Sequence, residues 1–290
     1  MARVSTTVKN GICVVKLARP EKLNALDLAM FRGIRDAAKR AAENDVRCVV
    51  VHGEGRAFCS GLDVRSTVGS VEELMRKDGA TNLVQDVSYL WRRVPAPVIA
   101  SVHGVCFGGG FQIALGADMR FAHPKTKFSI MEAKWGLVPD MGFSVVLPHI
   151  LPRDKTKELV MTARVFEAPE ARDLGLVTRI EENPLEAALE VAADIAAKSP
   201  DASRAAKRLV DAVYDHHRPL WLETYVQRKL LWTWNQLAMT AKSLRLPLVP
   251  GFLAPQPAWA QEADDVAQSA LEDLLSPTSS EEDIMGTKST

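Results

Sequence analysis

The sequence predicts an α/β protein with a mostly parallel sheet. Short β-rich runs alternate with helical patterns through its first half. Two of these runs, Cys48–Val51 and Val98–Val102, are continuously apolar, which is typical of strands covered on both faces of a sheet. Each leads into the same tripeptide, Val-His-Gly, and the two copies lie about fifty residues apart. This spacing indicates a repeated strand–loop–helix unit, and such alternation favours parallel pairing.

The N-terminal elements follow from turn and helix signals. A tight turn precedes a strand over Gly11–Ala18. Pro20 cannot extend a sheet, so a loop is expected next, with Asn24 as the cap of the following helix. Apolar residues recur at helical spacing over 26–41 and predict that helix.

The rest of the chain is mainly helical in pattern. A charged helix is expected over Val71–Arg93. After Pro184, helical patterns follow one another without intervening strands, over Leu185–Ala197, Ser203–Tyr214 and Leu220–Leu244. The last pattern is apolar on more than one side, which is typical of a helix buried against a partner subunit.

These patterns divide the chain into three parts. Residues 1–199 are expected to form an α/β core, and residues 200–275 a helical segment. Residues 276–290, rich in Ser, Thr and acidic side chains, have the composition of a disordered tail.

Composition excludes several classes of protein. The 290 residues carry 36 basic and 36 acidic side chains, so no basic field for nucleic acid or anionic lipid is expected. Hydrophobic residues at 47% and charged residues at 25% exclude wholesale disorder. No apolar run approaches the roughly 18 residues of a membrane span. The N-terminus also lacks the apolar stretch of a signal peptide. Neither a nucleic acid nor a membrane is therefore expected as a partner.

The cysteines provide a prediction of compartment. None of the four, Cys13, Cys48, Cys59 and Cys106, forms a C-x-x-C pair with another. Metal and redox motifs are therefore excluded, and free thiols in a reducing compartment are expected. The cytoplasm is the default location, with an organelle left open for a eukaryotic source.

Two glycine-bearing segments, Ala57–Asp63 and Gly108–Gln112, are candidates for binding a negatively charged oxygen. In the first, Gly61 permits a sharp turn and the close approach of a ligand. In the second, three glycines open a helix, whose N-terminal N–H groups favour negative charge. Two such loops after neighbouring parallel strands would aim two N–H groups at one oxygen, as an oxyanion hole requires.

A third segment, Ser129–Gly142, supplies two carboxylates. Glu132 and Asp140 are separated by Gly136 and Pro139, which fold the chain between them. Carboxylates close to an oxyanion hole could move a proton at the carbon next to a thioester carbonyl. Taken singly, glycine loops also serve turns and helix packing, and Asp63 is expected as a loop-capping carboxylate.

Together these segments resemble the crotonase family, the enoyl-CoA hydratase/isomerase group. The shared stretches span roughly residues 5–215 and include NGICVVKLARPEKLNAL, VRCVVVHGEGRAFCSGLD, PAPVIASVHGVCFGGGFQIALGADMRFA, FSIMEAKWGLVPDMG and ARDLGLVTRI. The resemblance implies a spiral of β-β-α units with a helical trimerisation segment over 200–275, and a homotrimer or dimer of trimers. It also implies acyl-CoA substrates and no cofactor, because coenzyme A is part of the substrate.

The resemblance also implies a set of site residues. The thioester oxygen would lie between the backbone N–H groups of Ser60 and Gly109. The substrate pocket would include Leu62, Gly108, Phe111, Gln112 and Trp135. Apart from the resemblance, Arg19, Lys22, Arg56 and Arg65 are candidates for the phosphates of coenzyme A because they lie near the loops, and Ala57 is a further candidate contact. No metal is implied.

The sequence departs from the hydratase pattern in its carboxylates. Hydratases of the family carry a Glu two residues after the GGG loop, where this chain has Gln112, which cannot ionise. Their second Glu is retained as Glu132. Family isomerases acting on dienoyl-CoA carry an Asp in the place of Asp140 and another in the place of Gln112. Monoenoyl-CoA isomerases use one Glu in the Glu132 position.

Double-bond isomerisation is therefore the expected reaction. Losing one of two cooperating carboxylates would slow water addition roughly 10²–10⁴-fold. Glu132 is expected as the principal base, with its pKa raised by apolar neighbours among Met131, Trp135 and Phe111, and Asp140 as a second acid/base. A hydratase stays open because Gln112 could orient water. From another class, a non-catalytic acyl-CoA-binding or scaffold member stays open as well.

Other chemistries fit the sequence less well. A dinucleotide fingerprint fails because Phe58 occupies its third glycine position, and no G-x-S-x-G of a serine hydrolase is present. The adjacent pair His216 and His217 would point about 100° apart on a helix, without a further ligand cluster. His52 and His103 are expected to form core or loop hydrogen bonds. Cys59 is expected to pack rather than act as a nucleophile.

Overall fold

The computed structural model describes residues 2–78, 81–214, 234–235, 238 and 253. Most of the expected helix over Leu220–Leu244, most of the segment 200–275 and the whole tail 276–290 lie outside the described residues. Among the helices that are described, none is long and apolar enough to cross a membrane.

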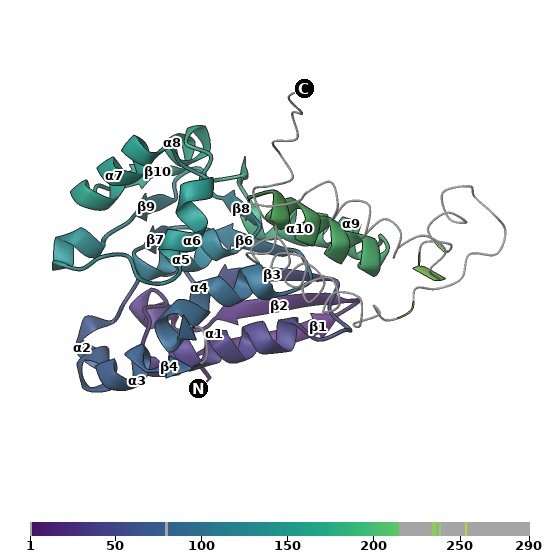
Figure 1. Ribbon diagram of the computed structural model, residues 1–290, viewed down its shortest axis with the longest axis horizontal. Coiled ribbons are helices and arrows are strands. Elements are labelled where there is room, and N and C mark those ends of the chain that lie inside the picture. Colours follow the sequence, from purple (N-terminus) through teal and green to yellow (C-terminus); the bar gives the residue numbers. More distant parts are fainter. Residues whose placement is uncertain (1, 79–80, 215–233, 236–237, 239–252, 254–290) are drawn as a thin grey trace, which may run out of the picture.

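A six-stranded sheet forms the centre of the protein, in the order β1-β2-β3-β6-β8-β11 (Figure 1). Only β1 runs antiparallel, paired with β2 across the predicted tight turn, while the other neighbours are parallel. The α/β class with a mostly parallel sheet is confirmed. The strands are β1 (Val4–Lys9), β2 (Ile12–Leu17), β3 (Cys48–Gly53), β4 (Lys77–Asp78), β5 (Thr81–Asn82), β6 (Val98–Val102), β7 (Val105–Phe107), β8 (Met119–Ala122), β9 (Lys127–Ser129), β10 (Phe166–Glu167) and β11 (Arg179–Ile180).

A smaller sheet, in the order β10-β9-β7, lies beside the large one. Each repeated unit contributes one strand to each sheet: β6 is followed by β7, and β8 by β9. The unit that begins with β3 does the same through Cys59, which forms an isolated parallel bridge with Cys106 of β7. The spiral of β-β-α units is thus present, and the loops that follow the small-sheet strands lie next to one another.

Helices cover both faces of the large sheet (Figure 1). On one face α1 packs against α4, and α4 against α5, while α9 packs across β3, β6 and β8 on the other. The helices are α1 (Leu28–Ala41), α2 (Val64–Thr67), α3 (Val71–Met75), α4 (Leu83–Arg93), α5 (Gly109–Gly116), α6 (Phe143–Val146), α7 (Arg153–Thr162), α8 (Ala168–Asp173), α9 (Pro184–Ala196) and α10 (Pro200–Tyr214). Short 3₁₀ turns are η1 (Pro20–Lys22), η2 (Val68–Ser70), η3 (Glu132–Trp135) and η4 (Leu147–His149).

Two of the expected elements are wrong. The single helix over Val71–Arg93 is broken, because Asn82 starts a new helix: its side chain accepts the N–H of Gln85 and forms a capping box. Asn24 does not cap α1. Asp27 does, by accepting the N–H of Met30 at 2.8 Å.

Asn24 instead joins two loops from inside the protein. Its side-chain oxygen accepts the N–H of Arg19 at 2.8 Å, and its amide donates to the carbonyls of Glu54 at 2.9 Å and Ala57 at 2.8 Å. The residue is fully buried and has a left-handed φ of 55°, which Asn tolerates better than most residues. It therefore fixes the loop before α1 to the loop after β3.

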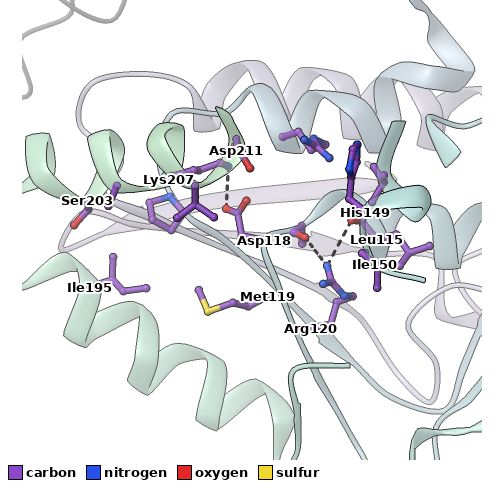
Figure 2. Close-up of a pocket in the computed structure, with 16 residues that line it drawn as sticks. Leu115, Asp118, Met119, Arg120, His149, Ile150, Ile195, Ser203, Lys207 and Asp211 are labelled. Carbon is purple, nitrogen blue, oxygen red and sulfur yellow. Dashed lines mark hydrogen bonds and ion pairs between the residues drawn. The ribbon is translucent and has the colours of Figure 1, made fainter. Parts of the chain in front are cut away.

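The far end of α5 is closed by Arg120, beside a cavity of about 530 Å³ (Figure 2). The buried guanidinium donates to the carbonyl of Ala117 at 2.5 Å and to that of Leu176 at 2.8 Å. An ion pair between Lys207 of α10 and Asp118, at 2.9 Å, lies in the same cavity. A cation at the C-terminal end of a helix stabilises it, so Arg120 fixes α5 at the end opposite to its glycines.

We expect Asn24→Ala to lower the free energy of unfolding by about 2–4 kcal/mol, because it leaves three buried backbone groups without partners. Asn82→Ala, which removes a helix cap, serves as the matched control and should lower it by about 1 kcal/mol. Urea unfolding of both variants at one protein concentration checks the order. Equal losses would contradict a special role for Asn24.

Candidate active site

The three segments singled out by their chemistry meet at one end of the small sheet. Cys59 and Phe107 are joined by a hydrogen bond from the N–H of Phe107 to the carbonyl of Cys59, at 3.1 Å. The N–H of Gly108 donates in turn to the carbonyl of Ser129 at 2.9 Å. The residues that follow these contacts, 60–63, 109–112 and 130–140, therefore leave the sheet side by side.

Two glycines allow the first two loops to touch through their backbones. A Cβ atom on Gly61, whose φ is 92°, would lie 2.8 Å from the carbonyl oxygen of Phe107 and 3.7 Å from the nitrogen of Gly109. A Cβ atom on Gly110 would lie 2.4 Å from the carbonyl oxygen of Cys59. Any side chain at either position would separate the loops.

The free amide groups at this contact belong to Leu62 and Gly109. Leu62 forms a parallel bridge with Leu26. In this bridge the N–H of Leu26 donates to the carbonyl of Gly61 at 2.8 Å, and the N–H of Asp63 donates to the carbonyl of Leu26 at 3.0 Å. In such a bridge the N–H of Leu62 itself points to the other side of the loop. Gly109 is the first residue of α5, so its N–H has no partner within the helix. Within the described part of the chain neither N–H forms a hydrogen bond.

The prediction for Ser60 is corrected by this arrangement. Its N–H donates to the carbonyl of Leu23 at 2.9 Å and is not available to a ligand. Its hydroxyl contacts the carbonyl of Lys22 at 3.4 Å. Leu62, two residues further on, takes its place as the candidate donor, and Gly109 remains a candidate because its N–H is without a partner among the described residues.

Glu132 lies at the start of η3 directly beside the glycine loop. One carboxylate oxygen, Oε1, accepts from the Gln112 amide at 2.6 Å, and the other, Oε2, is buried without a hydrogen-bond partner among the described residues. A Cβ atom on Gly108 would lie 3.3 Å from Oε1. The carboxylate thus has one oxygen held by the protein and one left for chemistry.

Burial sets the protonation behaviour of both carboxylates. Burial raises the pKa of Glu132 above its usual range, and the charge of Asp140 raises this pKa further. Hydrogen bonds to the carboxylate lower the pKa but do not cancel the effect of burial. The expected direction of the shift is confirmed. The pKa of Asp140 is also raised by the protein atoms around it, although its side chain stays in contact with solvent. The charge of Asp140 is therefore felt at Glu132.

Gln112 is committed to the protein rather than to a ligand. It is 1% exposed, and its side-chain oxygen accepts the N–H of Met141 at 2.9 Å while its amide donates to Glu132. Its backbone carbonyl also accepts from the Ser88 hydroxyl at 2.7 Å. One amide hydrogen is left, so the expectation that Gln112 orients water has little support in this geometry.

The remaining pocket residues are divided between core and surface. Phe111 packs in the core, with its ring centroid 5.1 Å from that of Phe128 and 6.0 Å from that of Phe166, which corrects its assignment to the pocket. Trp135 is 60% exposed and therefore lies at the surface. Leu62 and Gly108 line the contact between the loops.

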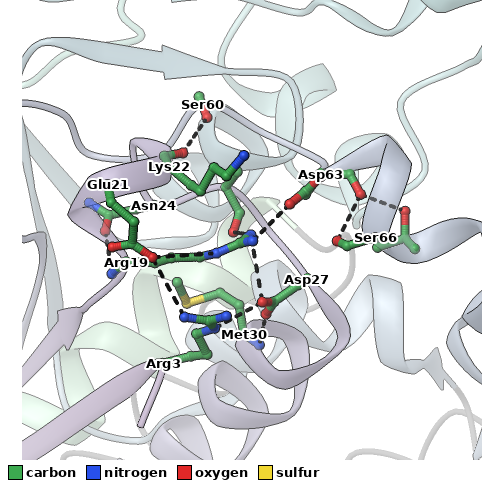
Figure 3. Close-up of polar contacts among 12 residues, drawn as sticks. Arg3, Arg19, Glu21, Lys22, Asn24, Asp27, Met30, Ser60, Asp63 and Ser66 are labelled. Carbon is green, nitrogen blue, oxygen red and sulfur yellow. Dashed lines mark hydrogen bonds and ion pairs between the residues drawn. The ribbon is translucent and has the colours of Figure 1, made fainter. Parts of the chain in front are cut away.

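The residues expected to contact coenzyme A also lie partly in the interior and partly at the surface, and Figure 3 shows two of them, Arg19 and Lys22. Arg19 is buried, and its guanidinium forms an ion pair with Asp63 at 2.9 Å, so the expectation of a phosphate contact is wrong. Ala57 is buried too, with its carbonyl bonded to Asn24. Lys22, Arg56 and Arg65 are exposed, and among the described residues none of these three forms an ion pair. They remain candidates for phosphate groups.

The histidines and Cys59 have the structural roles that were expected. His52 and His103 contact the carbonyls of Gly53 at 3.2 Å and Gly55 at 2.9 Å. Cys59 is fully buried, and burial raises the pKa of its thiol to about 12, which disfavours a nucleophilic thiolate. The described residues contain no group of His, Cys, Asp and Glu side chains placed to hold a metal ion.

Sequence reasoning missed three contributors to the site: the N–H of Leu62, the N–H of Met141 and the side chain of Asn24. A signal for Leu62 was present in Gly61, since a left-handed residue turns the chain that follows it. The other two contacts join segments 29 and 33 residues apart in the chain, and no local pattern encodes them.

Comparison with known proteins agrees with this site. The family model of enoyl-CoA hydratase/isomerase matches residues 7–236. The chain is 34% identical over 206 residues to putative enoyl-CoA hydratase/isomerase YngF of Bacillus subtilis, covering 69% of this chain and 78% of the relative. It is 33% identical over 227 residues to mitochondrial Delta(3,5)-Delta(2,4)-dienoyl-CoA isomerase of Mus musculus, covering 73% and 69%.

Solved structures share the fold. The crystal structure of a putative enoyl-CoA hydratase from Streptomyces coelicolor is similar with a TM-score of 0.77 and 31% identity, over 86% of this chain and 94% of that one. A putative enoyl-CoA hydratase/isomerase from Mycobacterium abscessus gives a TM-score of 0.78 at 26% identity, over 87% and 99%. With its two sheets and paired glycine loops, the chain belongs to the enoyl-CoA hydratase/isomerase family, within the crotonase superfamily.

We expect Glu132→Gln to become progressively more stable than the wild type as pH rises. Because burial raises the pKa of Glu132, the folded protein binds this proton more tightly than the unfolded chain. The wild type therefore loses stability as pH rises from the ordinary carboxyl pKa through the raised one, and the variant does not. Urea unfolding between pH 4 and pH 8 measures the difference.

Lys134→Gln, an exposed change on the same turn, is the matched control and should show no such trend. A difference between wild type and Glu132→Gln that stays constant with pH would contradict a buried, ionising Glu132.

Proposed function

We propose that the protein is an enoyl-CoA isomerase that shifts a double bond in fatty acyl-CoA thioesters. The observation that carries the proposal is the state of the Glu132 carboxylate. One oxygen is held by Gln112 beside the glycine loop, and the other is buried without a hydrogen-bond partner among the described residues. A base with one free oxygen is suited to taking a proton from one carbon and returning it to another.

The proposed reaction begins when Glu132 removes a proton from C2 of a 3-enoyl thioester. The electron pair of that C–H bond moves into the thioester carbonyl and gives a dienolate. Its oxygen would accept hydrogen bonds from the N–H groups of Leu62 and Gly109, which stabilise negative charge where it develops. Return of the proton to C4 leaves the double bond between C2 and C3. No atoms are gained or lost.

Asp140 is proposed as a second acid or base for longer conjugated substrates. In a 3,5-dienoyl thioester the proton taken from C2 has to be returned at C6, further than one carboxyl group reaches. A second carboxyl group at the rim, whose charge already affects Glu132, fits that role. The likeness to a dienoyl-CoA isomerase supports the same assignment.

Water addition to trans-2-enoyl-CoA is the second candidate. The chain is 34% identical over 201 residues to the protein of Mycobacterium tuberculosis named enoyl-CoA hydratase EchA19. Gln112 argues against it, because an amide cannot take a proton and because its oxygen and one of its two amide hydrogens are already bonded to Met141 and Glu132. A non-catalytic protein of the family that only binds acyl-CoA is the third candidate. The presence of Glu132 and of both glycine loops argues against it, because binding alone would not need the carboxylate.

The same proposal includes assembly as a homotrimer or dimer of trimers through the segment 200–275. Beside the site, the side chains of Trp135, Leu137 and Val138 are 60%, 54% and 74% exposed. Apolar side chains this exposed and this close together are typical of a surface covered by another subunit. The four thiols are free and buried, which supports a reducing compartment such as the cytoplasm.

We expect Glu132→Gln to lower kcat for isomerisation of trans-3-enoyl-CoA by roughly 10²–10⁴-fold, because the amide cannot accept the proton. KM should change little, since the oxyanion donors remain. Lys134→Gln on the same turn is the control and should keep full activity. If the wild type and Glu132→Gln bind acyl-CoA equally and neither turns over any enoyl-CoA, the non-catalytic reading is correct instead.

We expect Gln112→Glu to gain hydratase activity on crotonyl-CoA by roughly 10-fold or more, because it supplies the second carboxylate that water addition uses. Gln112→Met, of similar size and without polar atoms, is the control and should gain none. Assay of both variants by the loss of the conjugated thioester absorbance measures the effect. High crotonyl-CoA hydration by the wild type would instead favour the hydratase.

A further inference from the structure

We propose that Arg19 is a positioning residue for the oxyanion hole: its ion pair with Asp63 fixes the loop that presents the Leu62 N–H. The inference rests on the proposed function, because it assigns a purpose to the Leu62 amide only if that amide binds a thioester oxygen. It gives the buried arginine a role in place of the phosphate contact that the sequence suggested.

The planar guanidinium of Arg19 has four partners, of which Glu21, 4.0 Å from Nε, is the most distant (Figure 3). One terminal nitrogen, Nη2, lies 2.9 Å from Oδ2 of Asp63. The other, Nη1, donates to the carbonyl of Ala25 at 3.0 Å and lies 3.6 Å from Oδ2 of Asp27. The guanidinium thus spans from the loop after β3 to the residues just before α1.

Asp63 is the residue that follows Leu62, so its placement sets the direction of the Leu62 peptide. On the N-terminal side the carbonyl of Gly61 is held by the N–H of Leu26. On the C-terminal side the backbone of Asp63 is bonded to the carbonyl of Leu26, and its carboxylate to Arg19. The Leu62 amide is therefore fixed at both ends, and only the carboxylate contact can be removed by a side-chain substitution.

Burial makes this contact strong. The side chain of Arg19 is 8% exposed and that of Asp63 18%. Burial alone would raise the pKa of the Asp63 carboxyl, and its hydrogen bond and ion pair with Arg19 lower it below the usual range instead. An ion pair this poorly solvated is weakly screened by salt and holds its geometry.

Arginine is suited to this position and lysine is not. A guanidinium offers donors in a fixed planar fork, which here reach Asp63 with one arm and Ala25 with the other. An ammonium group keeps the charge but is a single point, so it cannot serve both arms. Arg19→Lys therefore tests geometry separately from charge.

The network also supplies a control residue. Arg3 donates to Asp27 at 2.8 Å and belongs to the same cluster, but it makes no contact with Asp63 or with the loop after β3. Arg3→Met removes a half-buried ion pair with Asp27 and a longer one, at 3.8 Å, with Glu21, and changes no atom of the Arg19–Asp63 pair. It should lower stability without affecting the Leu62 amide.

The experiment compares Arg19→Lys, Asp63→Asn, the double variant and Arg3→Met in the full-length protein. We expect each of the first two to lower kcat for trans-3-enoyl-CoA about 10- to 100-fold, with KM within about 3-fold, because a misplaced donor weakens transition-state binding most. The double variant should lose no more than the worse single variant, because both remove one contact. Arg3→Met should keep the wild-type kcat.

A second readout follows the oxyanion hole without turnover. A bound 3-ketoacyl-CoA ionises to an enolate that absorbs in the near ultraviolet, and hydrogen bonds to the enolate oxygen lower the pH at which it forms. We expect that pH to rise by about one unit in Arg19→Lys and Asp63→Asn, and to stay in place in Arg3→Met. Binding of a saturated acyl-CoA should be within about 3-fold in all variants.

The outcomes separate this inference from the proposed reaction. If the enolate shift appears while no enoyl-CoA is isomerised, the positioning role holds and the isomerase proposal fails. If the Arg19 and Asp63 variants lose stability but keep both kcat and the enolate pH, Arg19 only supports the fold and the inference is overturned. It is overturned as well if Arg3→Met lowers kcat as much as Arg19→Lys does.

Discussion

The contact between two backbones, without side chains between them, is the constraint on which the site depends. Gly61 lies against Phe107, and Gly110 lies against Cys59, at distances that no Cβ atom permits. Because the loops touch, the N–H groups of Leu62 and Gly109 come together. Three buried side chains stabilise the segments that make this contact. Asn24 bonds to Ala57 in the loop after β3, Arg19 pairs with Asp63 in the same loop, and Arg120 bonds to Ala117 at the far end of α5.

The carboxylates are organised by a different kind of interaction. Gln112 connects α5, η3 and the chain at Met141 through one buried amide. Such a buried polar group is stable only when its hydrogen bonds are made, so the three segments keep a fixed relation. A glutamate at this position would place a second charge against Glu132, which explains how one substitution alters the chemistry open to the site.

The sequence predicted the class of fold, most of the core elements and the three segments of the site. Strand periodicity and glycine spacing are local signals, and they located β3, β6 and the start of α5 well. The predictions from the sequence were wrong where contacts between distant segments determine the structure. The break before Leu83 depends on the Asn82 cap. The ion pair of Arg19 with Asp63 and the hydrogen bond from the Ser60 N–H to the carbonyl of Leu23 join distant segments, so neither is visible in a local pattern.

The turn between Glu132 and Met141 is anchored at both ends and free in the middle. The N–H of Leu137 is bonded to the carbonyl of Glu132 at 3.1 Å, and Met141 is held by Gln112. Leu137, Val138 and Asp140 are exposed between these anchors. Substitutions at Leu137 and Val138 can therefore change the surface next to the site while the anchors at Glu132 and Met141 stay in place, so that the surface and the carboxylate geometry change separately.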